Sequence, residues 1–130
     1  MSPQLILGRL LGTTTISAKF CRVDKPDVCM TVNNMIVDTG AVVSAIPATV
    51  AKELGVQFPV EREFRLADGS VSKQRVGSIA IEIDGRKGFT EVIALKKGKP
   101  LVGVTALEAL GFTVNPKTGL LVKNDAALLL

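Results

Sequence analysis

Turn sequences follow one another at short intervals along the chain, and this spacing limits the fold more than any other feature. The runs between them have the length of strands. Ser78 to Ile83 is typical, because three isoleucines alternate with other residues, the pattern of a half-buried strand. The expected turns lie at Asp24 to Asp27, Asn33-Asn34, Asp68-Gly69, Asp84-Gly85, Lys97 to Pro100 and Asn115 to Gly119. The sequence therefore predicts a mostly β, largely antiparallel protein.

Two hairpins stand out among these strands. Glu61 to Leu66 and Val71 to Val76 flank Asp68-Gly69, a dipeptide that suits a tight hairpin turn. Near the C-terminus, Phe112 to Val114 and Leu120 to Val122 flank another turn sequence. An isolated apolar hairpin needs a partner, so we hypothesise that this second hairpin forms a sheet between two chains.

Two short helices are expected to interrupt the strands. Pro47 to Gly55 has Pro near its start and Gly after its end, the usual asymmetry of helix ends. Thr105 to Gly111 has Thr three residues before Glu108, the spacing of a capping box, and again a closing Gly. An apolar strand and a Gly precede each helix. The sequence therefore predicts two related halves about a pseudo-two-fold axis.

Composition limits the size and the chemistry of the protein. A chain of 130 residues with 47% hydrophobic content fits one domain, residues 1–130, with a single core. The chain has no His, which removes the usual base for a Ser or Cys nucleophile and the commonest zinc ligand. Carboxylates, lysines or hydroxyls would have to carry any proton chemistry.

Charge, cysteines and hydropathy bear on partners and location. The net charge of +4 permits contact with nucleic acid, but the basic residues are mostly scattered and no aromatic residues are interleaved for stacking, so we expect no nucleic-acid partner. No segment approaches the roughly 18 apolar residues that span a bilayer, and the start does not resemble a signal peptide. We expect no membrane partner and a cytoplasmic location. Cys21 and Cys29 could face each other across a hairpin, but we favour two reduced thiols on grounds of compartment.

One carboxylate lies in an otherwise apolar stretch. Asp38 stands in the sequence MIVDTGAVVSAI, residues 35–46, with apolar residues on both sides. Burying a carboxylate is costly unless it is paired, hydrogen-bonded or protonated. Asp38-Thr39-Gly40 could be a simple turn, because Asp and Gly are turn formers and Thr39 can bond the local backbone.

The wider context resembles the active-site segment of retroviral-type, retropepsin-like aspartic proteases. In that family two apolar residues precede Asp-Thr-Gly-Ala, and a hydroxyl residue follows six positions after the Asp, here Ser44. Leu101-Val102-Gly103 is similar to the apolar-apolar-Gly strand that leads into the family's helix, and the hairpin about Asp68-Gly69 falls where the family has its flap. The resemblance covers roughly Val32 to Val122. It is strongest to the small cellular and prokaryotic members.

The resemblance implies a fold, an activity and an assembly. The implied fold is a single-domain acid protease fold, a closed antiparallel β-barrel with a flap hairpin and one or two short helices. Aspartic proteolysis needs two carboxylates and the chain has one Asp-Thr-Gly, so a homodimeric endopeptidase is implied, with Asp38 of each chain at the two-fold axis. The two carboxyls would share a proton and activate a water against a polypeptide substrate. No metal or cofactor is implied.

Neighbouring residues take roles by the same resemblance. Thr39 would donate a hydrogen bond to the partner's backbone, Gly40 would let the backbone approach the substrate, and Ala41 would line the cleft. Val71 and Val102 are candidate subsite residues, although apolar residues in a β protein are more often core. The flap residues expected to close over the substrate are Leu66, Ala67, Asp68, Gly69 and Ser70.

Two positions depart from the viral pattern, and other functions stay open. Many viral members have an Asp four residues after the catalytic Asp and an Arg after the second-half Gly, which form an ion pair. Here the two positions hold Val42 and Val104, and an apolar pair can replace a buried ion pair at no net cost. A non-catalytic dimerisation or peptide-binding module of the same fold is the main alternative. A basic nucleic-acid-binding protein is another, supported by charge alone.

Overall fold

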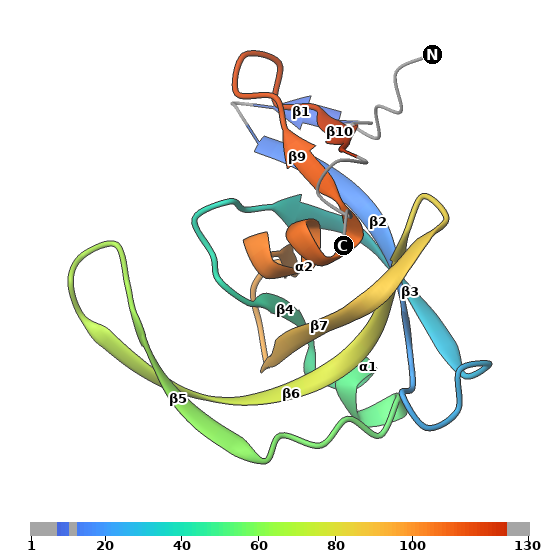
Figure 1. Cartoon of the computed structure of the whole chain (residues 1–130). Coiled ribbons are helices and arrows are strands. Elements are labelled where there is room, and N and C mark those ends of the chain that lie inside the picture. The colour runs from blue at the N-terminus through green and yellow to red at the C-terminus, as the bar shows by residue number, and fades with distance from the viewer. Residues whose placement is uncertain (1–7, 11–12, 125–130) are drawn as a thin grey trace.

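The computed structural model describes residues 8–10 and 13–124 and is built mainly of strands (Figure 1). The two helices are α1 (Ala48–Glu53) and α2 (Val104–Leu110). The strands are β1 (Gly8–Leu10), β2 (Thr13–Cys21), β3 (Cys29–Val37), β4 (Ser44–Pro47), β5 (Val60–Arg65), β6 (Val71–Ile83), β7 (Arg86–Leu95), β8 (Leu101–Val102), β9 (Phe112–Val114) and β10 (Leu121–Lys123). The predicted mostly β architecture is confirmed.

The first eight strands form one sheet in the order β1-β2-β3-β8-β4-β7-β6-β5, and a further pairing of β2 with β6 closes most of it into a ring. Strands β9 and β10 form a separate hairpin. Two pairings in the ring, β3 with β8 and β4 with β7, are parallel, and the others are antiparallel. The prediction of a largely antiparallel protein is confirmed, although the ring is not antiparallel throughout. A parallel pair needs a long crossover connection. Between β4 and β7, α1 and the β5–β6 hairpin form that connection.

The core lies inside this ring of strands and under the helices. Ile79, Ile81 and Ile83 of β6 are all buried, which confirms the alternating pattern of that strand. The other fully buried side chains of largest size come from both halves of the chain: Phe20, Met35, Ile46, Val92, Val102, Leu110 and Leu121. Because these residues belong to strands and helices far apart in sequence, packing of the core holds the two halves together.

Three of the predicted turns show how well local sequence specifies the backbone. Asp84 and Gly85 both have positive φ, 50° and 80°, as a two-residue turn of the mirror-image type requires. Asp68-Gly69 also lies in a hairpin turn, but the turn spans Leu66 to Gly69, with Gly69 at φ 88°. The prediction of a turn at Asn33-Asn34 is wrong. Both residues lie within β3, where they oppose Ser17 alone and form a bulge with Asn34 at φ 56°.

Both helices lie where they were predicted, and both are followed by a glycine of positive φ, Gly55 and Gly111. The predicted capping box on α2 is wrong. Gly103 occupies the N-cap and no side chain caps the helix, so Thr105 already lies in the first turn. The Thr105 hydroxyl donates instead to the carbonyl oxygen of Val42, at 2.6 Å. Neither helix of the described chain has the length and apolar character to cross a membrane.

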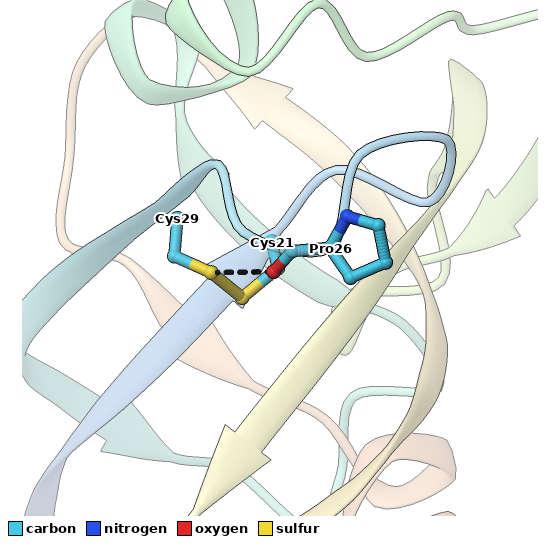
Figure 2. The surroundings of a disulfide bond; sticks show 3 residues. All are labelled: Cys21, Pro26 and Cys29. Carbon is cyan, nitrogen blue, oxygen red and sulfur yellow. Dashed lines mark hydrogen bonds between the residues drawn. A yellow bond between two sulfur atoms is a disulfide. The ribbon is translucent and has the colours of Figure 1, made fainter.

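A disulfide joins Cys21 at the end of β2 to Cys29 at the start of β3 (Figure 2). The two residues are directly opposed in the antiparallel pairing of the strands, which brings their side chains together. The Sγ atom of Cys29 also lies 3.2 Å from the carbonyl oxygen of Pro26 in the connecting turn. The expectation that the cysteines face each other is confirmed, and the prediction of two reduced thiols is wrong.

Candidate active site

Asp38 is the first residue after β3, and its backbone and side chain are both held. Its N–H donates to the carbonyl oxygen of Val102 at 3.0 Å, which extends the parallel pairing of β3 with β8. Its carboxylate Oδ1 accepts a hydrogen bond from the N–H of Gly40 at 2.9 Å. In the single chain Asp38 is half-buried, and Thr39 and Gly40 are exposed. The carboxylate is therefore oriented by the loop and still open to solvent.

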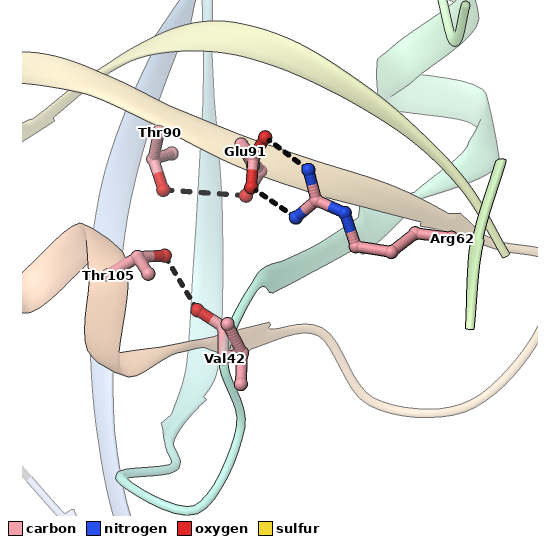
Figure 3. Close-up of polar contacts among 5 residues, drawn as sticks. All are labelled: Val42, Arg62, Thr90, Glu91 and Thr105. Carbon is pink, nitrogen blue, oxygen red and sulfur yellow. Dashed lines mark hydrogen bonds and ion pairs between the residues drawn. The ribbon is translucent and has the colours of Figure 1, made fainter. Parts of the chain in front are cut away.

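The loop that carries Asp38, residues 38–43, is attached to the start of α2. The carbonyl oxygen of Ala41 accepts the N–H of Val104 at 2.8 Å, and that of Val42 accepts the N–H of Thr105 at 3.3 Å. The carbonyl oxygen of Val42 also accepts the hydroxyl of Thr105, as Figure 3 shows. The first N–H groups of a helix have no partner within the helix, so these loop carbonyls satisfy them. We call residues 38–43 the site loop.

A buried hydrogen bond fixes the end of the site loop to the second half of the chain. The Ser44 side chain is fully buried, and its Oγ accepts the N–H of Gly103 at 3.0 Å. The backbones approach so closely here that a Cβ on Gly103 would lie 2.5 Å from the carbonyl oxygen of Val43. Gly103 is thus required for space, which explains the apolar-apolar-Gly pattern.

Ser44→Ala should lower the free energy of unfolding by about 1 to 3 kcal/mol, because it leaves the N–H of Gly103 buried without a partner. Urea unfolding would measure the loss. Ser78→Ala is the matched control, since it removes a hydroxyl from an exposed position of β6. Equal stability of the Ser44 variant and the control would contradict the assigned role.

The predicted flap is the tip of a hairpin that extends from the body of the protein as a curved arm (Figure 1). The arm, residues 60–76, pairs Val60 with Val76 at its base and Arg65 with Val71 near its tip. Leu66 to Ser70 are all exposed. The tip therefore has the exposure that a segment closing over a ligand would need.

Asp68 organises the turn at the tip of the arm. Hydrogen bonds from the hydroxyl and then the N–H of Ser70 to Asp68 Oδ1, at 2.6 and 2.9 Å, lower the pKa of this carboxyl below its ordinary value. The free energy with which these hydrogen bonds stabilise the turn is fully present above the ordinary pKa of Asp. It is lost as the pH falls through the lowered pKa of Asp68. The turn therefore keeps its hydrogen bonds into the acid range.

The remaining predicted residues separate by exposure. The side chain of Val102 is fully buried and therefore belongs to the core and not to a substrate subsite. Its carbonyl oxygen accepts the N–H of Asp38. Val71 is 52% exposed at the tip of the arm, which favours contact with a ligand over a place in the core. Ala41 is partly exposed in the site loop. Of the two valines at the viral ion-pair positions, Val42 is 53% exposed and Val104 is partly buried.

Two grooves in the described part of the chain do not include Asp38. One, of about 490 Å³, lies between the segment after α1 and the base of β6. Another, of about 470 Å³, lies beside the disulfide and Phe89. We place the candidate site at Asp38 and not in either groove, because neither contains the site loop or the tip of the arm.

The sequence does not predict two sets of contacts, one at the site loop and one at the arm. The capping-box pattern places Thr105 at a helix cap, and its hydrogen bond to the site loop follows only from the folding of α2 against that loop. Arg62 and Glu91, which form an ion pair between the arm and β7, carried no signal because they are 29 residues apart in sequence. Both depend on contacts between distant segments.

Comparison with known proteins shows one matching family and two proteins of similar structure. A family model described as gag-polyprotein putative aspartyl protease matches residues 30–109, which include Asp38 and Gly103. A retropepsin-like aspartic protease from Rickettsia conorii has a similar structure, with a TM-score of 0.58 and 20% identity over 95% of this chain and 90% of that chain. The simian foamy virus protease aligns with a TM-score of 0.49 and 16% identity, over 72% of this chain and 91% of that chain. A search of curated proteins gave no match.

Proposed function

Since this chain belongs to the family of gag-polyprotein putative aspartyl proteases, we propose that it is a homodimeric aspartic endopeptidase. The observation that supports this best is the state of Asp38, a half-buried carboxylate oriented by the N–H of Gly40 at the end of β3. A carboxylate held in this way needs only a second carboxylate to form a catalytic pair. Asp38 of a second chain is that group in our proposal.

In the proposed reaction the two Asp38 carboxyls share one proton, because two carboxylates in contact cannot both ionise. The ionised member takes a proton from a bound water, whose oxygen attacks the carbonyl carbon of the peptide bond. The protonated member donates to the developing oxyanion. Collapse of the tetrahedral intermediate re-forms the C=O double bond and breaks the C–N bond, whose electron pair leaves with the nitrogen. The nitrogen takes up a proton from the carboxyl pair. No other group of the chain has to enter the reaction.

The surroundings of Asp38 support a polypeptide as substrate. The backbone at Gly40 is exposed and has no Cβ, so an extended chain can approach it closely. Leu66 and Val71 leave apolar surface exposed near the tip of the arm, where we propose that it closes over the substrate. Ala41 in the site loop is a further residue that we propose contacts the substrate. Exposed apolar side chains at these positions favour apolar substrate residues beside the bond that is cut.

Two features of the single chain support dimerisation. Thr39 is exposed beside Asp38, where we propose that its hydroxyl donates to the partner's backbone, and Val42 is a half-exposed apolar residue of the same loop. The hairpin of β9 and β10 stands outside the large sheet, with Phe112 and Leu121 anchored in the core of its own chain. Among the described strands each of the two pairs only with the other, so their outer edges can still pair with strands of a second chain. We propose that this hairpin takes part in the dimer interface.

Deletion of residues 112–130 should therefore abolish the dimer that the full chain forms. Because the deletion also removes the buried Phe112 and Leu121, only a folded monomer would support a role in the interface. Sedimentation would give the mass and circular dichroism the state of folding. Substitution of Val122 in β10 by Lys keeps the chain length and provides a milder test. A folded dimer of the truncated chain would exclude this hairpin from the interface.

Digestion of an unfolded protein between pH 3 and 7, with and without a statine-type transition-state inhibitor, tests the proposed activity. We expect cleavage that is strongest in the acid range and is lost with the inhibitor, because the pair works only while it holds one proton. A verified dimer that binds peptides and cuts none of them would instead support the non-catalytic binding module.

A further inference from the structure

A two-point ion pair joins the arm to the body of the protein. The Arg62 guanidinium on β5 meets the Glu91 carboxylate on β7, with Nη1 to Oε1 at 2.8 Å and Nη2 to Oε2 at 3.1 Å (Figure 3). Two parallel hydrogen bonds fix both the distance and the angle between the side chains. The pair therefore restrains the direction of β5 as well as its position.

Glu91 lies where the sheet connects the arm to the site loop. The next residue, Val92, pairs with Gly77 of β6 on one side and with Ser44 of β4 on the other. Gly77 is where β6 leaves the arm and enters the body, and Ser44 follows the site loop directly. The ion pair thus attaches the arm beside a row of residues that leads to the loop carrying Asp38.

The other attachments of the arm lie at its base. A Cβ on Gly77 would overlap with the carbonyl oxygen of Gln57, so β6 is packed tightly against the segment that precedes β5. Arg75 donates to the carbonyl oxygens of Phe58 and Pro59, at 2.8 and 3.1 Å. Those carbonyls belong to the chain entering the arm, and among the strands of residues 8–10 and 13–124 β5 pairs with β6 alone. The continuous strand β6 also links the arm to the body, so Arg62 and Glu91 act on the direction of the arm together with these contacts.

We propose that Arg62 and Glu91 are positioning residues that hold the arm at a set angle over Asp38. This inference rests on the proposed function, since it assumes that the arm closes over a substrate. The pair is about two-fifths exposed, and such pairs add little to global stability. Its effect is on geometry, because a rotation at the base of the arm moves the tip by a much larger distance.

Arg62→Gln and Glu91→Gln should each raise KM about two- to fivefold, the factor expected for an exposed ion pair, with a smaller change in kcat and the dimer intact. Lys73→Gln and Glu63→Gln are the matched controls, because they remove the same charges from exposed positions of the arm and leave the ion pair in place. The exchanged pair, Arg62→Glu with Glu91→Arg, should recover part of the lost affinity. A purely structural role would change stability and leave KM unaltered.

Nuclear magnetic relaxation of backbone amides tests the same inference without any activity. Amides of Leu66 to Ser70 should show larger microsecond-to-millisecond exchange in Arg62→Gln than in Lys73→Gln, while those of α2 remain unchanged. If the amides of the arm behave alike in both variants, the ion pair does not position the arm. This readout separates the two proposals, because a chain that cuts no peptide can still show the change in the arm.

Discussion

Asp38→Asn is expected to reduce peptide hydrolysis about a thousandfold or more and to leave the fold and the dimer intact. Asn has the shape of Asp and can still accept the hydrogen bond from the N–H of Gly40, so the site loop has no reason to move. It cannot ionise, and therefore cannot take the proton from water. Digestion of an unfolded protein at acid pH measures the loss. Asp27→Asn makes the same chemical change in an exposed turn and should keep full activity.

Mixed dimers make this experiment specific for a shared site. Equal amounts of wild-type and Asp38→Asn chains, allowed to exchange, form about one quarter wild-type dimers. If each active site needs Asp38 from both chains, the mixture should therefore have about a quarter of the activity of wild-type protein at the same total chain concentration. Chains that each held a complete site would retain about half. The second result would contradict the dimeric pair while keeping Asp38 as a catalytic residue.

Gly103→Ala is expected to have the largest effect on stability. The added Cβ would lie 2.5 Å from the oxygen and 2.7 Å from the carbon of the Val43 carbonyl group, and 2.9 Å from the oxygen of Ala41. All three are backbone atoms, and the oxygen of Ala41 also accepts the N–H of Val104, so α2 would have to move away from the site loop. Overpacking of this kind costs about 2 to 3 kcal/mol. Peptide hydrolysis should fall as well, since the loop that carries Asp38 is displaced.

Gly88→Ala is the matched control for this substitution. Its Cβ would approach Cδ2 of Leu110 at 2.9 Å, the end of a side chain that can change rotamer. Urea unfolding should therefore show a small loss for Gly88→Ala and a large one for Gly103→Ala. Equal losses in the two variants would mean that crowding of the backbone at Gly103 does not hold the site loop.

The local elements were predictable because each depends on residues close together in sequence. Alternating isoleucines identified the second half of β6, which the structure shows as one continuous strand with the predicted run from Val71 to Val76. Asp84-Gly85 identified a hairpin turn, and the glycines after α1 and α2 identified both helix ends. The same local rules misassigned Asn33-Asn34. These residues are common in turns, but pairing of β2 with β3 on both sides turned them into a bulge. The segment around Asp38 indicated the family, and the family model confirmed that resemblance.

The sequence by itself determined the mostly β character, several of the strands, most of the turns, both helices and the segment in which Asp38 lies. Only the tertiary structure decided the parallel pairing of β3 with β8, the burial of Val102, the bond from Thr105 to the site loop and the attachment of the arm through Arg62 and Glu91. The physical reason is the range of the interactions. Turns and helix ends follow from backbone preferences of a few adjacent residues, whereas these contacts join segments that become neighbours only when the core is packed.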